Sequence, residues 1–469
     1  RQAALSMDRF LQGASLTAVR PAVRNGRTEL YTNTAKITSL SPISPKETEK
    51  YTPDEAQQEA ARCIRCQCLE CVTNCAYLQK FGGYPKSYAR QFYNIAAIVQ
   101  GVRQANRIID SCSLCGLCEE LCPNDFSMAD LCLESRRHMV QEGHMPPSAH
   151  WFALEEMRSA AGEGALLLHA PGQNESTRLF FPGCQLGGVR PEQTQILLEK
   201  LLELEPRTGI WLDCCGAPAH WSGRDDEFRQ VAARLGEQWE SMGSPRVLTA
   251  CSTCLKMFRD HLPQIKTDSV WSLLAEQEIA PAPARPVVAV SDPCTARHDS
   301  TVQQDVRTLL TKAGVPLEQL SLSGKKTECC GFGGLMENAN AELAAEVATR
   351  RVSQTDAVIM TYCAMCREQL AKTGKPVLHI LDILFPETAH PAEEKPIRLS
   401  DRRINRRKLK AAVSARYPER EQPAAPSLEK IPLTIEETAA LQMEERRILE
   451  DDIRQVLAPE KENDENAFL

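Results

Sequence analysis

Residues 111–123 read SCSLCGLCEELCP, in which Cys112, Cys115, Cys118 and Cys122 follow the spacing C-x2-C-x2-C-x3-C and a proline comes next. A loop this short lets three thiolates surround one iron–sulfur cube, while the fourth, before the proline, points toward a second cube. Zinc is the alternative, but tetrahedral zinc sites are commonly built from two separated cysteine pairs. The stretch therefore predicts one cubane [4Fe–4S] cluster and, through Cys122, a second.

An earlier stretch, residues 62–77, reads RCIRCQCLECVTNCAY and contains five cysteines, one more than a [4Fe–4S] cluster takes. It does not repeat the spacing above, because position 65 is arginine. The cysteines of this stretch give the series Cys63-x2-Cys66-x4-Cys71-x3-Cys75, with Cys68 left over. The question is which of the five serve as ligands.

This series, with its lead-in EAARC at 59–63, resembles the N-terminal cluster region of the glutamate synthase small subunit and of dihydropyrimidine dehydrogenase. If the last cysteine of each run crosses to the other cluster, two sets result. One cube takes Cys75, Cys112, Cys115 and Cys118, and the other takes Cys63, Cys66, Cys71 and Cys122. A competing set for the second cube stays open, namely Cys66, Cys68, Cys71 and Cys122.

The composition limits the protein class. The chain has 469 residues, 42% of them apolar, which is enough for two or three domains with hydrophobic cores. Its net charge of −7 gives no reason to expect nucleic acid as a partner, and no apolar run approaches the roughly 18 residues of a membrane span. The 20 cysteines fall mostly in tight groups without a visible signal peptide, which favours a reducing, cytoplasmic compartment over a secreted disulfide framework.

A pattern of short apolar strands alternating with helices begins near residue 177 and occurs twice. In each copy a strand leads to one cysteine, the next strand or loop leads to Cys-Cys-Gly, and a third strand leads to a CxxC that opens a helix. The cysteines of the first copy are Cys184, Cys214, Cys215, Cys251 and Cys254, and those of the second are Cys294, Cys329, Cys330, Cys363 and Cys366. The repeat predicts two α/β lobes related by a pseudo-twofold axis.

The adjacent cysteine pairs indicate the kind of metal centre. Two neighbouring residues cannot easily direct both thiolates at one tetrahedral ion, whereas a multi-iron unit with bridging sulfur can use both. Gly216 and Gly331, which follow the pairs, allow a tight turn and close approach of the backbone to a cofactor. A CxxC at a helix start places thiolates where the positive end of the helix favours anions.

These duplicated cysteines resemble the paired CCG modules of the heterodisulfide reductase catalytic subunit, which also occur in iron–sulfur subunits of glycolate and lactate oxidases. The resemblance covers residues 50–386. It implies two further [4Fe–4S] clusters, non-cubane in type, that cleave a disulfide bound between the modules. All ten motif cysteines are present, so nothing in the motif argues against loading both modules.

The predicted fold is α+β: a helical dicluster ferredoxin-like domain, two pseudo-twofold-related α/β CCG lobes and a helical C-terminal tail. The expected segments are an N-terminal helix and linker at 1–50, the dicluster domain at 51–160, the CCG modules at 176–283 and 284–390, and a charged helical tail at 391–469. Further expected details are a capping box at Thr52 and Glu55, helices over 89–109, 128–142 and 433–457, and a solvated or partner-docking basic helix at 398–410.

The first residues, RQAALSMDRFLQG, resemble the final helix of the NAD(P)H- and FAD-binding module in relatives of the glutamate synthase small subunit. The resemblance implies a flavoprotein partner, as a separate subunit or a fused domain. The chain begins at Arg1 rather than Met, so a segment upstream is expected. The chain is expected to work within a multi-subunit complex.

Three functions remain. The favoured one is an iron–sulfur oxidoreductase subunit that passes electrons from a flavin partner through two cubanes to CCG clusters that reduce a disulfide. His220 and His298, close in sequence to the cysteine motifs, are candidate proton donors to a leaving thiolate. The alternatives are a quinone-linked subunit of a hydroxyacid-oxidising complex and a non-catalytic electron relay or docking subunit.

Overall fold

This computed structural model describes two compact units, Arg1–Leu69 and Glu70–Leu469. The residues it describes are 11–13, 40–45, 51–62, 68–83, 85–97, 104–123, 126–145, 149–279, 286–389, 396–416, 435, 440, 442–444 and 453. Most of the helix predicted over the first 13 residues, and of that over 433–457, lies outside this description. In the first unit, α2 (Pro53–Ala61) has the predicted capping box, since Glu55 N–H donates to Thr52 Oγ1 at 3.3 Å and Thr52 N–H donates to Glu55 Oε2 at 3.0 Å.

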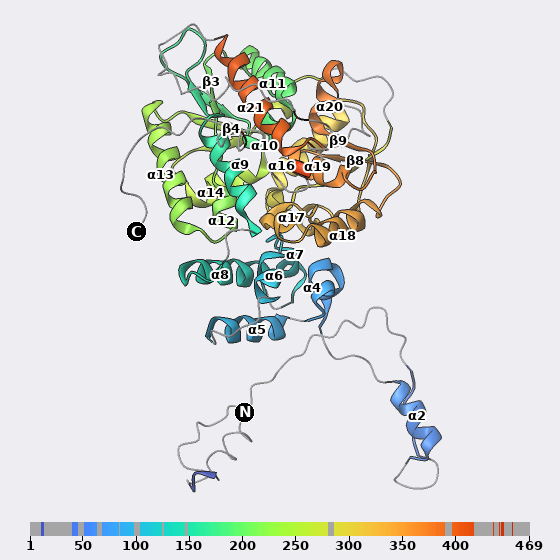
Figure 1. Ribbon diagram of the computed structural model, residues 1–469. Coiled ribbons are helices and arrows are strands. Elements are labelled where there is room, and N and C mark those ends of the chain that lie inside the picture. Colours follow the sequence, from blue (N-terminus) through green and yellow to red (C-terminus); the bar gives the residue numbers. More distant parts are fainter. Residues whose placement is uncertain are drawn as a thin grey trace. The chain divides into compact units, whose positions relative to one another are not determined.

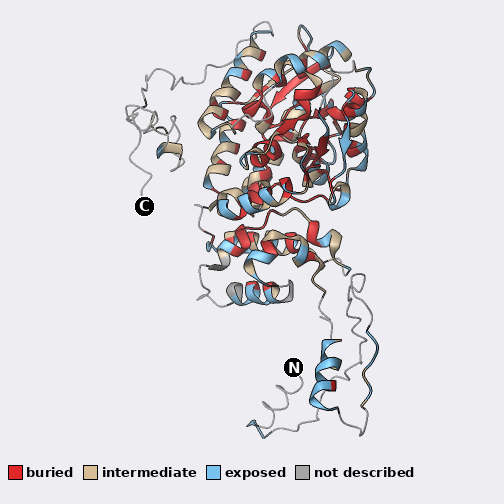
Figure 2. Ribbon diagram, turned by 90° about the vertical axis from the view of Figure 1, so that its right-hand side faces the viewer, coloured by how far each residue is buried: buried red, intermediate tan, exposed pale blue. Residues whose placement is uncertain are grey.

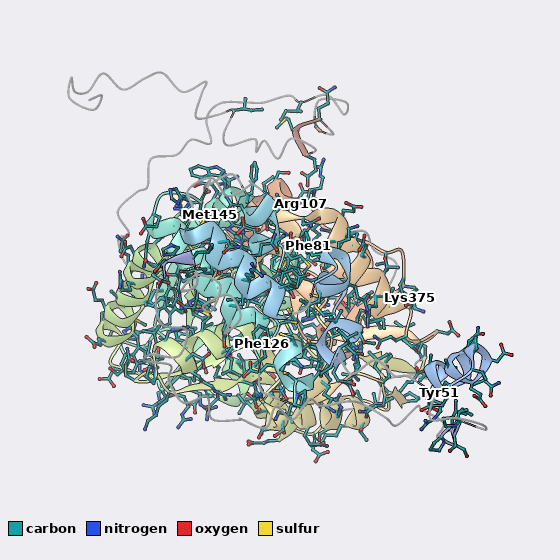
Figure 3. The ribbon with its side chains drawn as sticks, turned by 90° about the horizontal axis from the view of Figure 1, so that it is seen from below. Tyr51, Phe81, Arg107, Phe126, Met145 and Lys375 are labelled. Carbon is teal, nitrogen blue, oxygen red and sulfur yellow. The ribbon has the colours of Figure 1, made fainter. Side chains whose placement is uncertain are left out.

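The second unit begins with a layer of short helices that forms the lower part of its ribbon (Figure 1). They are α3 (Glu70–Asn74), α4 (Ala76–Phe81), α5 (Pro85–Ala97), α6 (Gln104–Asp110), α7 (Leu117–Leu121) and α8 (Met128–Gln141). The helix predicted over 89–109 is described as two segments, α5 and α6, and residues 98–103 between them lie outside the description. Figure 3 views this layer from below, with Phe81, Phe126 and Met145 labelled among its side chains.

The first module has a five-stranded sheet of order β1-β3-β2-β4-β5. Its strands are β1 (Leu166–Leu168), β2 (Arg178–Phe181), β3 (Thr208–Leu212), β4 (Arg246–Thr249) and β5 (Thr267–Ser269). Strands β2 to β5 pair in parallel, and β1 adds an antiparallel edge. The helices are α10 (Cys184–Val189), α11 (Pro191–Leu204), α12 (Ala217–Trp221), α13 (Asp225–Ser241), α14 (Ser252–His261) and α15 (Val270–Ala275), preceded by α9 (Trp151–Ala161).

The second module repeats the parallel part of this order as β7-β6-β8-β9. Its strands are β6 (Val288–Val290), β7 (Leu317–Glu318), β8 (Val358–Thr361) and β9 (Val377–His379). Its helices are η2 (Cys294–Ala296), α16 (Ser300–Lys312), η3 (Gly324–Lys326), η4 (Gly333–Leu335), α17 (Met336–Ala339), α18 (Ala341–Val352), α19 (Ala364–Ala371), α20 (Ile380–Leu384) and η5 (Pro386–Thr388). The equal strand order confirms the predicted pair of α/β modules.

The two modules share one hydrophobic core. Phe180 and Leu197 of the first module belong to the same buried cluster as Val290 and Leu309 of the second. The buried residues concentrate in and around the sheets of the two modules (Figure 2). A buried ion pair also joins the modules, because Arg190 Nη1 lies 2.6 Å from Asp382 Oδ1.

The basic stretch predicted as a solvated or partner-docking helix forms α21 (Leu399–Ser414). The prediction is wrong for one face of this helix, on which Arg402, Arg403, Arg406, Leu409 and Val413 are buried, whereas Arg398 and Lys408 are exposed. The helix packs against α10 and α11 of the first module. No helix in the described part of the chain is both long and apolar enough to cross a membrane.

Candidate iron–sulfur centres

The loop before α7 turns sharply and brings several cysteine thiols close together. Leu114 and Gly116 have positive φ angles of 52° and 75°, which turn the chain sharply between the motif cysteines. Burial raises the pKa of the Cys75 thiol, and the neighbouring Cys115, Cys112 and Cys118 thiols raise it further. The structure therefore brings together the four cysteines predicted for one cube.

The structure describes only some of the cysteines predicted to bind the second cube. Cys71 lies on α3, which packs against α7, and Cys122 ends α7. Cys63 and Cys66 lie outside the described residues, and Cys68 belongs to the other unit. Both ligand sets proposed for this cube remain predictions.

In the first module, five thiols form a continuous chain of contacts. Cys184 lies 3.5 Å from Cys214, Sγ to Sγ. Hydrogen bonds from Cys214 and Cys254 lower the pKa of the Cys215 thiol to about 6. A hydrogen bond from Cys254 likewise lowers the pKa of Cys251 to about 7. The adjacent cysteines therefore face different neighbours, Cys184 and Cys254, as expected if both serve one extended centre.

The second module repeats this chain of contacts in the same order. Cys294 hydrogen-bonds to Cys329, and Cys329 to Cys330. Cys330 contacts Cys366, which in turn contacts Cys363. The ten CCG cysteines thus form two equivalent groups at the carboxyl ends of parallel strands, where open α/β sheets commonly bind ligands.

These groups fit iron–sulfur clusters by their donor chemistry. Thiolates are the ligands of such clusters, and each group supplies five thiols, each in contact with the next. All eighteen described cysteines are free thiols. Among the described residues, no three His, Cys, Asp or Glu side chains take the arrangement of a single-ion site.

The two predicted glycines have geometric reasons to be glycine. Gly216 has φ +80° and Gly331 has φ +94°, a region that side chains disfavour. A Cβ on Gly331 would lie 2.6 Å from the carbonyl oxygen of Ala344, whereas one on Gly216 would meet side-chain atoms of Phe228 and Val231 at 3.0 Å. Close packing against the protein itself therefore explains both residues, and their cofactor-binding role remains a prediction.

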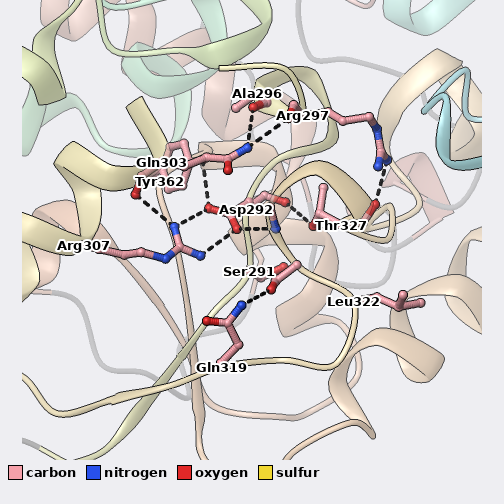
Figure 4. Close-up of polar contacts among 12 residues, drawn as sticks. Ser291, Asp292, Ala296, Arg297, Gln303, Arg307, Gln319, Leu322, Thr327 and Tyr362 are labelled. Carbon is pink, nitrogen blue, oxygen red and sulfur yellow. Dashed lines mark hydrogen bonds and ion pairs between the residues drawn. The ribbon is translucent and has the colours of Figure 1, made fainter. Parts of the chain in front are cut away.

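The dicluster loop contacts the second module directly. Hydrogen bonds from Cys115 and Cys294 lower the pKa of the Cys329 thiol. Arg297 Nε donates to the Cys115 carbonyl at 3.1 Å and fixes the loop beside η2. Figure 4 shows the polar network around Asp292, which lies two residues before Cys294. The Asp292 carboxylate accepts two hydrogen bonds from Arg307 and one from Tyr362. A predicted cubane ligand and a predicted CCG ligand are therefore neighbours.

A cavity of about 260 Å³ lies against the cysteine group of the first module and extends to the second module. All five cysteines of the first module and Cys363 of the second line it. Apolar side chains, including Trp221, Phe332 and Met365, make up much of the remaining wall, and Arg402 of α21 also lines it. A small molecule in this cavity would lie against the thiols of the first module and beside Cys363 of the second.

Neither predicted proton donor is among the described residues that line the cavity. The His220 ring packs against Phe228 and His261 at 5.2 and 4.6 Å between centroids. Its burial, and then nearby positive charge, lower the pKa of His220 to about 4. His298 is exposed and lies 3.4 Å from Glu120, Nε2 to Oε1. The structure thus adds no support for the histidine roles, which remain predictions.

Residues beyond the motifs also support the candidate centres. Cys132, expected as a core cysteine, is fully buried and contacts both Cys112 and the Tyr77 hydroxyl, the latter at 3.6 Å. Arg136 donates to the Cys112 carbonyl at 2.7 Å, and Arg406 donates to the Cys184 carbonyl at 2.7 Å. The one sequence signal for Arg406 is its place on the helical stripe that also carries Leu409 and Val413.

Comparisons with known families agree with this organisation. Residues 62–127 match the 4Fe-4S dicluster domain, and residues 178–259 and 288–371 each match the cysteine-rich domain. The matches confirm the predicted dicluster domain and the predicted duplication. They do not determine the number or the type of the clusters.

Several curated proteins are similar to more than half of this chain. A subunit of the fumarate reductase (CoM/CoB) of Methanothermobacter marburgensis is 24% identical over 72% of this chain and 74% of its own. The glycolate oxidase iron-sulfur subunit of Escherichia coli is 20% identical over 70% of this chain and 94% of its own. EtfAB:quinone oxidoreductase of Syntrophomonas wolfei is 21% identical over 55% of this chain and 42% of its own. The chain thus contains a 4Fe-4S dicluster domain and two cysteine-rich domains, and it is related to heterodisulfide reductase-like and glycolate oxidase iron–sulfur subunits.

Proposed function

We propose that this chain takes electrons from an NAD(P)H-linked flavoprotein, passes them through two cubane [4Fe–4S] clusters, and delivers them to CCG clusters that reduce a disulfide. The observation that carries the proposal is the cavity lined by cysteines of both modules. A disulfide placed there would have candidate iron–sulfur ligands on two sides. The described cysteines of the chain are free thiols, which suits a reducing compartment, and we therefore place the protein in the cytoplasm.

The contact between Cys115 and Cys329 supports the entry route. Cys115 belongs to the predicted cubane set, and Cys329 belongs to the second module. Because electron transfer requires close centres, this contact favours entry into the CCG region through the second module. Arg297 and Arg136 hold the backbone on the dicluster side of the contact.

The cavity wall suits a two-electron reduction. Breaking one S–S bond consumes two electrons, here from the reduced flavin of the partner, and two protons, and it yields two thiols. Iron of bound clusters would supply Lewis-acid stabilisation of each developing thiolate. Trp221, Phe332 and Met365 limit water around the reacting sulfur atoms, which strengthens electrostatic interactions there.

A quinone-linked role is the second candidate. It is favoured by the match to nearly the full length of the glycolate oxidase iron-sulfur subunit and by the name of the Syntrophomonas relative. In that case, electrons from a hydroxyacid-oxidising flavoprotein would reach quinone, which takes two electrons and two protons to become quinol.

The test starts with iron and acid-labile sulfide per chain in protein purified without oxygen. We expect roughly sixteen irons, four for each of four clusters, and oxidation of reduced methyl viologen when a disulfide is added. Cys254→Ser should lose about four irons and the disulfide-dependent oxidation, whereas the buried control Cys132→Ser should keep all its iron.

Other outcomes separate the alternatives. Roughly eight irons in the wild-type chain would contradict loaded modules and favour the relay or docking role. Full iron with reduction of a water-soluble quinone analogue, but of no disulfide, would favour the quinone-linked role.

A further inference from the structure

Helix α21 lies outside both repeats, yet it reaches the cysteines of the first module. It packs on α10, which begins at Cys184. Gly187 and Gly188 allow the close approach, because a Cβ on either would lie 3.0–3.1 Å from Leu409 or Arg406. Asn405 Nδ2 fixes the contact by donating to the Gly188 carbonyl at 2.8 Å.

This packing places the Arg406 guanidinium next to the backbone of Cys184. Arg406 is 5% exposed, and its Nε donates to the Cys184 carbonyl at 2.7 Å. Arg406 is therefore close enough to stabilise negative charge on this group of cysteines.

The local charge balance leaves a positive excess. Glu156 on α9 is the acid that pairs with Arg406 and Arg402, whereas Glu163 pairs with Arg407. Glu156 Oε1 lies 2.6 Å from Arg406 Nη2 and 3.9 Å from Arg402 Nη1. One carboxylate therefore serves two guanidinium groups. In addition, buried Arg406 Nη1 has no hydrogen-bond partner among the described residues. The nearby Asp213 is already paired with Arg234.

The corresponding loop of the second module is held differently. There Asp292, two residues before Cys294, binds Arg307, Tyr362 and the Gly324 N–H from within the module (Figure 4). The position two residues before Cys184 is Pro182, which offers no such carboxylate. In the first module, Arg406 holds this loop from outside the repeat by donating to the Cys184 carbonyl.

We propose that Arg406 is a positioning residue of the first module that holds the Cys184 loop and raises the reduction potential of the cluster bound there. The inference rests on the proposed function to the extent that the first module must carry a cluster. One-electron reduction adds a negative charge to a cluster, and a nearby buried cation stabilises that charge. Residues that contact the ligands of a metal centre tune its properties in this way.

The experiment compares five variants with the wild-type full chain, all purified without oxygen. Each is titrated with dithionite and followed by electron paramagnetic resonance, and iron is counted in parallel. The signal of the first module is the one lost in Cys254→Ser. Arg406→Gln removes the charge, Arg406→Lys keeps it, and Glu156→Gln removes the carboxylate that partly neutralises it. Arg407→Gln is the control, because Arg407 lies on the same helix but pairs with Glu163 at 3.7 Å, near the surface.

We expect Arg406→Gln to lower the potential of the first-module signal and Glu156→Gln to raise it. Arg406→Lys should stay closer to wild type than Arg406→Gln, and Arg407→Gln should not shift the signal. The second-module signal should stay constant throughout. If Arg406→Gln loses its iron, the potential of its first-module cluster cannot be measured. Two other results then test the proposal: a raised potential in Glu156→Gln and retained iron in Arg406→Lys.

Two results overturn the inference. A first-module potential that stays the same in loaded Arg406→Gln, or in loaded Glu156→Gln, would show that the charge does not reach the cluster. A wild-type chain with no iron in the first module would instead contradict the proposed function itself, and the inference with it.

Discussion

The glycines after the cysteine pairs show how single residues shape the modules. Gly374, Gly216 and Gly331 all have positive φ, but a Cβ would meet nothing within 4 Å at Gly374, side chains at Gly216 and a carbonyl oxygen at Gly331. Alanine at Gly374 should cost only the backbone strain, about 1 kcal/mol of unfolding free energy. Gly216→Ala should cost about 1–2 kcal/mol and Gly331→Ala about 3 kcal/mol.

Thermal unfolding of the three variants, with iron counted in each, checks this order. The Gly374→Ala chain is the matched control for backbone strain alone. Equal melting temperatures for all three would show that the carbonyl of Ala344 moves aside and that close packing does not explain Gly331.

For His220 and His298, the sequence did not predict where the side chains point. His220 stands five residues after Cys215 and His298 four after Cys294. Nearness along the chain does not fix where a ring points. The His220 ring turns to Phe228 and His261, and His298 reaches Glu120 on the dicluster domain.

At the scale of elements, the strands and the cysteine motifs could be predicted because their signals are local. A short apolar segment precedes five of the six cysteine motifs, and in these five cases the structure has a strand before the motif. Cys329 instead follows the loop and η3 after β7. Helix α21 could not be placed, because its arginines look solvated until Glu156 and the Gly187–Gly188 contact are known. Both partners lie more than two hundred residues away.

A pair of truncations tests α21 as part of the first module. Ending the chain after Pro396 removes Leu409 and Val413 from the shared core and Arg406 from the Cys184 loop. We expect that chain to lose several kcal/mol of stability, on the order of 1.5–3 kcal/mol for each buried aliphatic side chain, and about four irons. Ending it after Arg416 keeps the helix, so iron content and melting temperature should match the full chain. A shorter chain with full iron would contradict this role.

At the scale of the whole molecule, the repeat predicted two similar modules, and the structure shows their shared core and equal strand order. The sequence could not show how the dicluster domain meets them. That arrangement depends on single buried contacts between distant segments, such as Cys115 with Cys329, which have no periodicity to detect.

Arg136 of α8 joins the dicluster domain to both modules. Its fully buried guanidinium donates to five carbonyl oxygens, those of Ile109, Asp110, Cys112, Trp221 and Gly334, at 2.6–3.1 Å. The first three belong to the dicluster domain, Trp221 to the first module and Gly334 to the second. A lysine at this position offers three donors from one point, so Arg136→Lys should leave buried carbonyls unpaired and cost about 3–5 kcal/mol.

Thermal unfolding followed by cluster absorbance and by circular dichroism measures this cost. In Arg136→Lys we expect the dicluster helices to unfold at a lower temperature than the two modules. Arg137→Gln is the control, because the neighbouring Arg137 is partly exposed and pairs with Asp225 at 3.1 Å. It should unfold as the wild type does. If Arg136→Lys also unfolds with wild-type behaviour, the apolar contacts of Met336, Leu343 and Ala344 with the dicluster core are sufficient to hold the domains together.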